Sequence, residues 1–307
     1  MKQKTISKEI IVEGKGLHYG EYTTLTIKPS APNSGYIFKR TDVIPNQIIE
    51  AVVENVGICS RCTSISKNNI SIFTIEHLLA ATYSLGIDNV LFEINGKEVP
   101  ILDGNAKSFI DLYKKNCDII EQEEELKIYD IKEIIPYINE KDNVELILSP
   151  AEKLELEFYL DFKFDYSPQV AKLTDMKDFE EEISKARTFV YISDIENLVK
   201  AGQIKGGDIN NAIVIVDKEF TQKEYDNIAE MLNKPKFKVQ KIGEIFNHTP
   251  PYYENEQARH KLLDLLGDLS LIGYRFNAHI KAKRSGHYFN TEFAKQIRNY
   301  IQKNLEL

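Results

Sequence analysis

The chain has 307 residues, 42% hydrophobic and 28% charged, which is the profile of a globular protein with one large domain or two smaller ones. Its net charge of −8 argues against a nucleic-acid partner, because phosphates would be repelled by an acidic surface. No apolar run approaches the roughly 20 residues of a membrane span, and the first residues lack the apolar core of a signal peptide. Three cysteines, an odd number, do not make a disulfide framework. These features predict a cytoplasmic protein without an integral membrane segment.

The first two predicted strands, 5–13 and 23–28, alternate polar and apolar residues. The glycine-rich segment 14–20 between them predicts a hairpin connection rather than a dinucleotide-binding loop, because a strand follows it instead of a helix. His18 lies at the tip of this connection. It is a candidate site residue, and an exposed loop histidine fits the same pattern equally well.

Cys59 and Cys62 form a CxxC motif. A structural zinc site would need a second ligand pair, which Cys117 does not supply, and a redox pair would need a thioredoxin-like strand and helix around it. We therefore interpret both cysteines as small residues of a strand.

Residues 74–86 have the pattern of a helix, with Thr74 as the expected N-cap and Gly86 just beyond the C-terminus. Glu76 and His77 then lie in the first turn, at the positive end of the helix dipole. That field keeps a carboxylate ionised and favours the neutral imidazole, which is the form that binds metals. The alternative is a first turn that simply faces water.

The acidic run 121–125 is interpreted as a solvated linker and as the boundary between two α+β domains, 1–122 and 126–307. The remaining predicted elements are strands at 87–95, 127–137, 144–148, 154–162, 212–216 and 275–283, and helices at 106–115, 176–184, 194–201, 219–232 and 289–302.

The segment 254–273 predicts a helix with a deep apolar face and a narrow strip of ionisable residues. His260, Asp264 and Asp268 fall within about 80° of one another on this helix. Leu271 lies beside the strip, which suggests that the strip is partly buried. Buried carboxylates and imidazoles are costly unless they are paired or bound to a metal, whereas a strip that faces water needs no partner.

Three separate segments thus offer metal-binding groups: 76–77, the helix strip, and 285–287, which ends in a histidine. Two histidines and one carboxylate, with a fourth position open, are the ligand set of a catalytic zinc. Glu76, next to His77, is placed to act as a base without being a ligand. A histidine kept charged by a buried aspartate can protonate a leaving amine or stabilise an oxyanion.

A series of short motifs resembles one known family. In chain order they are TIEH at 74–77, VPILDG at 99–104, ARTF at 186–189, KGG at 205–207, ENE at 254–256, RHK at 259–261, DxxGD at 264–268 and SGH at 285–287. With them, the chain resembles the UDP-3-O-acyl-N-acetylglucosamine deacetylases of lipid A biosynthesis from the 16–18 loop to the final helix. The resemblance implies a zinc-dependent hydrolase that removes acetate from the 2-acetamido group of an acylated UDP-sugar. It also implies an α+β fold in two domains, each a β-sheet layered with helices, packed with the helices facing and the active site between them.

Carried over by position, the resemblance implies roles for individual residues. The zinc ligands are His77, His260 and Asp264. Glu76 corresponds to the general base, and His287, oriented by Asp268, to the partner acid or electrostatic stabiliser. Thr188 corresponds to the hydroxyl that binds the tetrahedral oxyanion, and Lys261 to a residue at the polar end of the substrate.

The resemblance also implies substrate contacts. Leu17, Phe189 and the segment 195–209, with Gly207 in it, match an apolar passage for the acyl chain, next to the loop that carries His18.

Other matched positions lie toward the polar part of the substrate. Asp161, Phe162 and Arg284 match positions near the nucleotide, with Arg284 in place of an expected lysine. Asn143 stands where some members carry a lysine toward the diphosphate. Cys62 matches a small or thiol residue that lines the site.

The connection 217–247 is longer than the usual pattern of the family. Some relatives with such a connection are fused to a hydroxyacyl-carrier-protein dehydratase, which a chain of this length is too short to contain. We expect a monomer with the acylated UDP-sugar as its partner, and the chain could equally be the N-terminal part of such a fusion. Two alternatives stay open: a zinc amidohydrolase of the same fold that acts on another acylated amide, and a non-catalytic module that binds a nucleotide-sugar.

Overall fold

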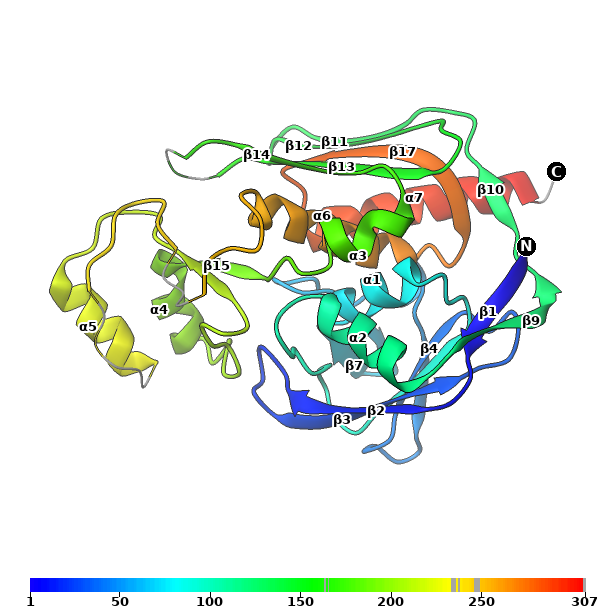
Figure 1. Ribbon diagram of the computed structural model, residues 1–307, viewed down its shortest axis with the longest axis horizontal. Helices are drawn as coiled ribbons and strands as arrows, with labels where there is room; N and C mark the ends of the chain where they lie inside the picture. Colours follow the sequence, from blue (N-terminus) through cyan, green and yellow to red (C-terminus); the bar gives the residue numbers. More distant parts are fainter. Residues whose placement is uncertain (163, 165, 233–235, 237, 246–248, 306–307) are drawn as a thin grey trace.

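The computed structural model describes residues 1–162, 164, 166–232, 236, 238–245 and 249–305. Two β-sheets form the outer layers of the main body, and helices lie between them (Figure 1). A smaller unit of helices and short strands extends from one end (Figure 1). The prediction of an α+β fold with the helices facing one another is confirmed.

The first sheet has the order β2-β3-β8-β4-β5. Its strands are β2 (Ile10–Lys15), β3 (Tyr22–Pro29), β8 (Val90–Ile94), β4 (Tyr36–Arg40) and β5 (Gln47–Glu50). Their alternating side chains bury one face, as period-two strands do. Helices α1 (Glu76–Ser84) and α2 (Lys107–Asn116) lie on that face, and the hairpin of β6 (Ser64–Lys67) and β7 (Ile70–Phe73) leads into α1 (Figure 1).

The second sheet has the order β11-β12-β17-β13-β14, and β10 pairs with the start of β17. Its strands are β10 (Ile128–Asp130), β11 (Ile135–Asn139), β12 (Val144–Ser149), β13 (Leu154–Leu160), β14 (Gln169–Leu173) and β17 (Arg275–Lys283). Helices α6 (Glu256–Ser270) and α7 (His287–Leu305) lie on its inner face (Figure 1). The short helices η1 (Val53–Asn55), η2 (Met176–Asp178) and α3 (Phe179–Glu182) lie in connections.

Helices α1 and α6 pack against each other between the two sheets. One hydrophobic core runs through both halves, from Leu25 and Phe38 of the first sheet to Phe158 and Ile280 of the second. The crossing is close at Gly267, where a Cβ atom would lie 2.2 Å from the Glu76 carbonyl oxygen. This contact sets the residues of one helix directly against those of the other.

We expect Gly267→Ala to lower the free energy of unfolding. Alanine is favoured over glycine inside a helix by about 1 kcal/mol, but overpacking against a rigid backbone costs about 1–3 kcal/mol, so the clash outweighs the helix preference. Urea unfolding measures the difference. The control is Gly286→Ala, because a Cβ atom added at Gly286 would have no described atom within 4 Å. A Gly267→Ala variant as stable as the unsubstituted protein would contradict the close crossing.

A smaller unit extends from the main body and has its own hydrophobic core. It contains β15 (Phe189–Tyr191), α4 (Ile192–Lys200), β16 (Ile213–Ile215) and α5 (Gln222–Met231). β15 and β16 pair in parallel. Its core consists of Ile192, Ile195, Val214, Val216, Tyr225 and Ile228.

The interpretation of the acidic run as a solvated linker is wrong. It belongs to strand β9 (Ile119–Glu125), which pairs antiparallel with β1 (Lys2–Ile6). The backbone forms the ladder while the carboxylates stay in solvent, and Lys2 and Lys4 stand opposite Glu125 and Glu121. Opposite charges across a strand pair support this arrangement. The domain boundary at this position stays a prediction.

Two local expectations also need correction. Thr74 does not cap α1, because it has a φ of 59° and its hydroxyl donates to Glu98 Oε1 at 2.7 Å. The helix begins at Glu76 instead, while Gly86 has the expected left-handed conformation after its end. Cys59 and Cys62 lie in the irregular segment 57–63, before β6, and not in a strand.

Candidate metal centre

His77, His260 and Asp264 converge between α1 and α6. One ligand atom from each lies within 4.8 Å of the others. Asp264 Oδ1 is 3.3 Å from His260 Nε2 and 3.6 Å from His77 Nε2, and the two imidazole rings meet edge to face. His260 and Asp264 lie one turn apart on α6, and His77 lies in the first turn of α1, so the close helix crossing brings the three together.

The ionisable strip of α6 is buried. His260, Asp264 and Asp268 are 3%, 1% and 0% exposed, which excludes the alternative that this strip faces water. Such groups are costly in the interior unless each has a partner. The arrangement of these partners therefore indicates what the site binds.

The donor atoms fit a cation. His260 Nδ1 lies 3.0 Å from the Ala186 carbonyl oxygen, which accepts its proton and leaves the Nε2 lone pair facing the Asp264 carboxylate. Burial lowers the pKa of His260 to about 3, so the imidazole is neutral. Asp264 Oδ1 is buried and makes no hydrogen bond within the described part of the chain. A lone pair facing a carboxylate oxygen is repulsive unless a positive charge lies between them, and two imidazoles with one carboxylate are suitable ligands for zinc.

Lys261 compensates part of the charge of Asp264. Its Nζ donates to Asp264 Oδ2 at 2.6 Å. Burial alone would lower the pKa of Lys261, but the adjacent carboxylate of Asp264 raises it above its usual value. Lys261 is therefore a fixed cation at the edge of the site.

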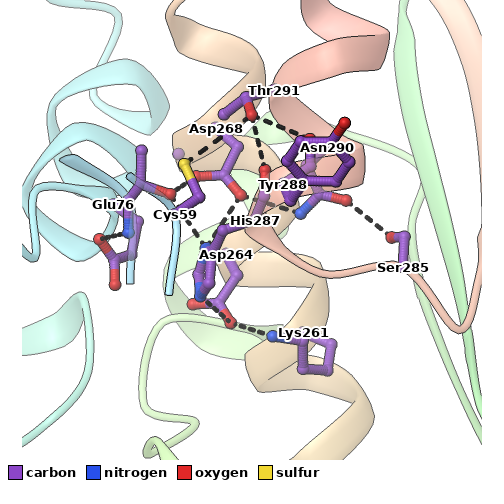
Figure 2. Close-up of polar contacts among 12 residues, drawn as sticks. Cys59, Glu76, Lys261, Asp264, Asp268, Ser285, His287, Tyr288, Asn290 and Thr291 are labelled. Atoms are coloured by element: carbon purple, nitrogen blue, oxygen red, sulfur yellow. Dashed lines mark hydrogen bonds and ion pairs between the residues drawn. The ribbon is translucent and has the colours of Figure 1, made fainter. Parts of the chain in front are cut away.

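His287 belongs to a polar network that includes Asp264 and Asp268 (Figure 2). Its Nδ1 lies 3.1 Å from Asp268 Oδ2, while its Nε2 lies 3.8 Å from Asp264 Oδ2. Burial lowers the pKa of His287, but Asp268 and Asp264 outweigh it and raise the pKa to about 9. The imidazole is thus a cation at neutral pH.

Two residues of this network had no part in the sequence analysis. Thr63 Oγ1 contacts His287 Nδ1 at 3.0 Å and donates to Asp268 Oδ1, and Asn290 Nδ2 donates to Asp268 Oδ2 at 2.9 Å. Asn290 stands three residues after His287 on α7, a helical spacing that could have identified it. Thr63 follows the CxxC motif and carried no such signal.

Glu76 lies close to the candidate metal ligands without joining their cluster. It is 3% exposed, and its Oε2 accepts a hydrogen bond from the Thr63 backbone N–H at 3.0 Å. Burial raises the pKa of Glu76 above its usual value. A raised carboxylate pKa makes this side chain a better proton acceptor in the site.

Thr188 lines the cavity next to this centre. Its backbone N–H donates to the Gly104 carbonyl oxygen at 2.8 Å, and Gly104 has a φ of 72°. A Cβ atom at Gly104 would lie 1.8 Å from the Asn211 carbonyl oxygen. The glycine of the VPILDG motif is therefore required where three segments meet at Thr188.

The catalytic cavity, defined here as the cavity of about 530 Å³ over the candidate centre, continues into a smaller cavity of about 110 Å³. Both are lined by Leu17, Arg61, Thr188, Phe189 and Val190. The smaller one, the apolar passage, also contains His18 and Gly207 in its wall.

The loop with Leu17 and His18 is held by a buried glutamate that the sequence analysis missed. Glu98 accepts hydrogen bonds from the backbone N–H groups of His18 and Tyr19, both at 2.9 Å. On the other side, the Gly206 N–H donates to the Leu17 carbonyl oxygen at 3.1 Å. Two loops far apart in sequence thus form the start of the passage.

The remaining candidate residues lie at different distances from the cavity. Asp161 and Arg284 line it and form an ion pair of 2.7 Å. Phe162 is buried behind them against Phe164 and Tyr166. Their roles stay predictions.

Two further positions lie outside the described cavity wall. Cys62 is 3% exposed, whereas Cys59, on the same loop, lines the cavity. Asn143 is exposed in the turn between β11 and β12. Their substrate contacts also stay predictions.

One known protein family matches the chain over most of its length. The family described as UDP-3-O-acyl N-acetylglycosamine deacetylase, LpxC, matches residues 3–233 and 237–299. The chain belongs to this family. The match contains both α1 and α6, so the elements that form the candidate metal centre are family elements.

Curated relatives of two kinds are similar to this LpxC-family chain. The "bifunctional enzyme LpxC/FabZ" of Bacteroides thetaiotaomicron is 41% identical over 98% of the chain and that of Porphyromonas gingivalis 39% over 99%, and the chain covers 65% of each. The "UDP-3-O-acyl-N-acetylglucosamine deacetylase" of Haemophilus influenzae is 34% identical over 97% of the chain and 90% of the relative. The chain thus spans just under two thirds of the length of the bifunctional relatives. No described helix is long and apolar enough to cross a membrane.

Proposed function

We propose that this chain hydrolyses the 2-acetamido group of UDP-3-O-acyl-N-acetylglucosamine and releases acetate, with zinc as its metal, in lipid A biosynthesis. The observation that carries the proposal is the buried cluster of His77, His260 and Asp264, in a cavity whose wall also contains the Glu76 carboxylate and the cationic His287 imidazole. Family membership supplies the substrate class. A nucleotide-sugar substrate agrees with the cytoplasmic location expected from the sequence.

His77, His260 and Asp264 would hold the zinc ion. Bound there, zinc supplies Lewis acidity, which polarises an amide carbonyl and lowers the pKa of water to about 7. Lys261 balances the charge of Asp264 and marks the polar end of the site. Proton transfer and stabilisation of the oxyanion are carried out by side chains of the protein.

Glu76 acts as the base that takes the proton of the attacking water. Its burial and raised pKa suit this role, and its hydrogen bond from the Thr63 N–H holds the carboxylate in place. The Thr188 hydroxyl, in the cavity wall, donates to the oxyanion that develops on the amide.

His287 holds a proton at Nε2 while Asp268 contacts Nδ1. In this state the imidazolium stabilises the oxyanion or protonates the leaving amine. Asp268 orients the ring and maintains its charge, and Thr63 and Asn290 in turn hold both oxygens of Asp268.

The substrate is proposed to occupy both cavities. The acyl chain enters the apolar passage past Leu17 and Phe189, while the nucleotide lies toward Asp161 and Arg284. His18 is part of the passage wall, and burial lowers its pKa, so it presents a neutral ring to the acyl chain.

The similarity to the two bifunctional relatives supports a wider proposal, that this chain corresponds to the LpxC part of such a protein. The alternative of a non-catalytic binding module would be favoured by the loss of a ligand or of the base. Both histidines, Asp264 and Glu76 are present and brought together.

Zinc removal is the first test. We expect the purified protein to carry one zinc per chain, and a strong chelator to abolish acetate release without unfolding the chain, since the hydrophobic core is formed by other residues. Metal analysis, acetate release from UDP-3-O-acyl-N-acetylglucosamine and circular dichroism measure the three quantities. Restored activity on adding zinc back is the control. An active protein without stoichiometric metal would refute the metal assignment.

A second arm of this experiment addresses the substrate. UDP-N-acetylglucosamine without the acyl chain should react far more slowly, since each buried CH₂ contributes up to about 0.8 kcal/mol. Equal rates with and without the acyl chain would favour a hydrolase that acts on another amide.

A further inference from the structure

We propose that helix α5 sets the longest acyl chain that the protein accepts, and that Leu232 is the residue that limits its length. This inference rests on the proposed function, because it assigns the apolar passage to the acyl chain. It gives a role to the long connection 217–247, which the sequence left without one.

The passage has a catalytic end and an inner end. At the catalytic end its wall is shared with the catalytic cavity through Leu17, Thr188 and Phe189. The inner end is lined by side chains that the catalytic cavity does not share: Ile195, Leu198, Ile204, Ile209, Val214 and Leu232. A straight apolar chain that enters beside Thr188 is therefore directed into the small unit of α4, β16 and α5.

Leu232 lines the passage but does not belong to any of the short motifs that resemble the family. It is the C-cap residue of α5, and its N–H donates to the Ile228 carbonyl oxygen at 3.0 Å. Among the described lining residues it is the one contributed by the chain after β16. In Figure 1, α5 lies on the side of α4 that faces away from α6. Leu232 thus follows a helix that lies beyond α4 as seen from α6.

Helix α5 is fixed firmly enough to act as a wall. Tyr225, Ile228 and Ala229 are at most 6% exposed, and the first two pack in the small core with Ile195 and Val214, which also line the passage. A capping box formed by Thr221 and Glu224 begins the helix. The position of Leu232 is therefore fixed by the packing of α5 against Ile195 and Val214 of the passage wall.

A growing acyl chain should gain affinity until it meets this wall. Each methylene buried in the passage strengthens binding by up to about fourfold, and that gain ends where the next methylene would have to displace the Leu232 side chain. The value of kcat/KM should therefore rise with acyl-chain length up to one length and stop rising beyond it. This length is called the break.

The test uses Leu232→Ala and Leu232→Trp, with Met231→Ala as the matched control. Met231 precedes Leu232 on α5 and is not among the described residues that line the passage. Acetate release is measured with UDP-N-acetylglucosamine substrates whose saturated 3-O-acyl chains increase in length. We expect the break to move to longer chains in Leu232→Ala and to shorter chains in Leu232→Trp, and to stay in place in Met231→Ala.

A binding measurement separates this inference from the proposed function. Calorimetry of the metal-free protein with saturated fatty acids of increasing length should show the same displacement of the break in the two Leu232 variants. If the break stayed at the same acyl-chain length in both Leu232 variants, in turnover and in binding, the proposed role of α5 would be overturned. If no substrate of any length is hydrolysed, the proposed function fails, and the fatty-acid series alone then decides the inference: a displaced break supports it and an unchanged one overturns it.

Discussion

Glu76→Gln is expected to lower kcat by about 10²–10⁴-fold while the metal stays bound. Glutamine keeps the shape of the side chain and can still accept the hydrogen bond from the Thr63 N–H, but it cannot take a proton from water. The site would therefore keep its geometry and lose its proposed base. Steady-state kinetics of acetate release, together with zinc analysis of the same preparation, measure the two properties separately.

His77→Ala is the matched variant, because His77 is the next residue along α1 and is part of the cluster that can hold a metal. It should lose both zinc and activity. Equal zinc loss in the two variants would make Glu76 a ligand and would contradict its assignment as a base.

Asp268→Asn is expected to move the alkaline limb of the kcat/KM profile to lower pH and to reduce its plateau. Burial lowers the pKa of His287, and Asp268 and Asp264 raise it to about 9 against that cost, with Lys261 opposing them. An asparagine removes one negative charge at 3.1 Å, so the pKa of His287 should fall by about one to three units. Since the proposed mechanism needs the imidazolium, we expect activity to be lost at a lower pH. Rate profiles of both proteins between acid and alkaline pH measure the displacement.

His287→Gln provides the comparison for this experiment. It should depress the whole profile without loss of zinc, because the ring is not among the three converging ligands. Asn290→Ala is a milder probe, since it removes one hydrogen bond to Asp268 Oδ2 while leaving both charges in place. If Asp268→Asn left the alkaline limb and the plateau unchanged, the pairing of Asp268 with His287 would have no part in catalysis.

The network around His287 explains why two aspartates one turn apart on the same helix can have different roles. Asp264 Oδ1 faces two imidazole nitrogens and makes no hydrogen bond in the described part of the chain. Asp268 instead has hydrogen-bond partners on both oxygens, from Thr63, Asn290 and His287. One oxygen of Asp264 is thus left available for a cation while the other accepts from Lys261, whereas both oxygens of Asp268 are occupied in holding a cationic ring.

The sequence by itself determined the main elements and most of the candidate site. The helix expected at 254–273 corresponds to α6, and its ionisable strip was recognisable because a period of 3.6 residues places His260, Asp264 and Asp268 on one side. The strand at 275–283 has the bounds of β17, since alternation of apolar residues is a local property. The motif order was also sufficient to indicate the family that the comparisons show.

Only the tertiary structure decided contacts between segments distant in sequence. The acidic run forms strand β9 because it pairs with β1, which carries lysines opposite two of its glutamates. This partner lies more than a hundred residues earlier in the chain. Composition alone suggested a linker, since exposed carboxylates are typical both of solvated linkers and of strands that face solvent. Strand pairing depends on a second strand that no local pattern reveals.

The same reason limits what could be inferred about the site. Sequence spacing placed His77 in one helix and His260 with Asp264 in another, but it did not show that Gly267 lets those helices approach at Glu76. Thr63, Glu98 and Ala186 contribute through a hydroxyl, a buried carboxylate and a carbonyl oxygen, each of which meets its partner across the fold. Groups of these kinds are common in every sequence, so their roles arise from position rather than from residue type. Helix periodicity is set within a few residues, whereas burial and pairing are set by the packing of the whole chain.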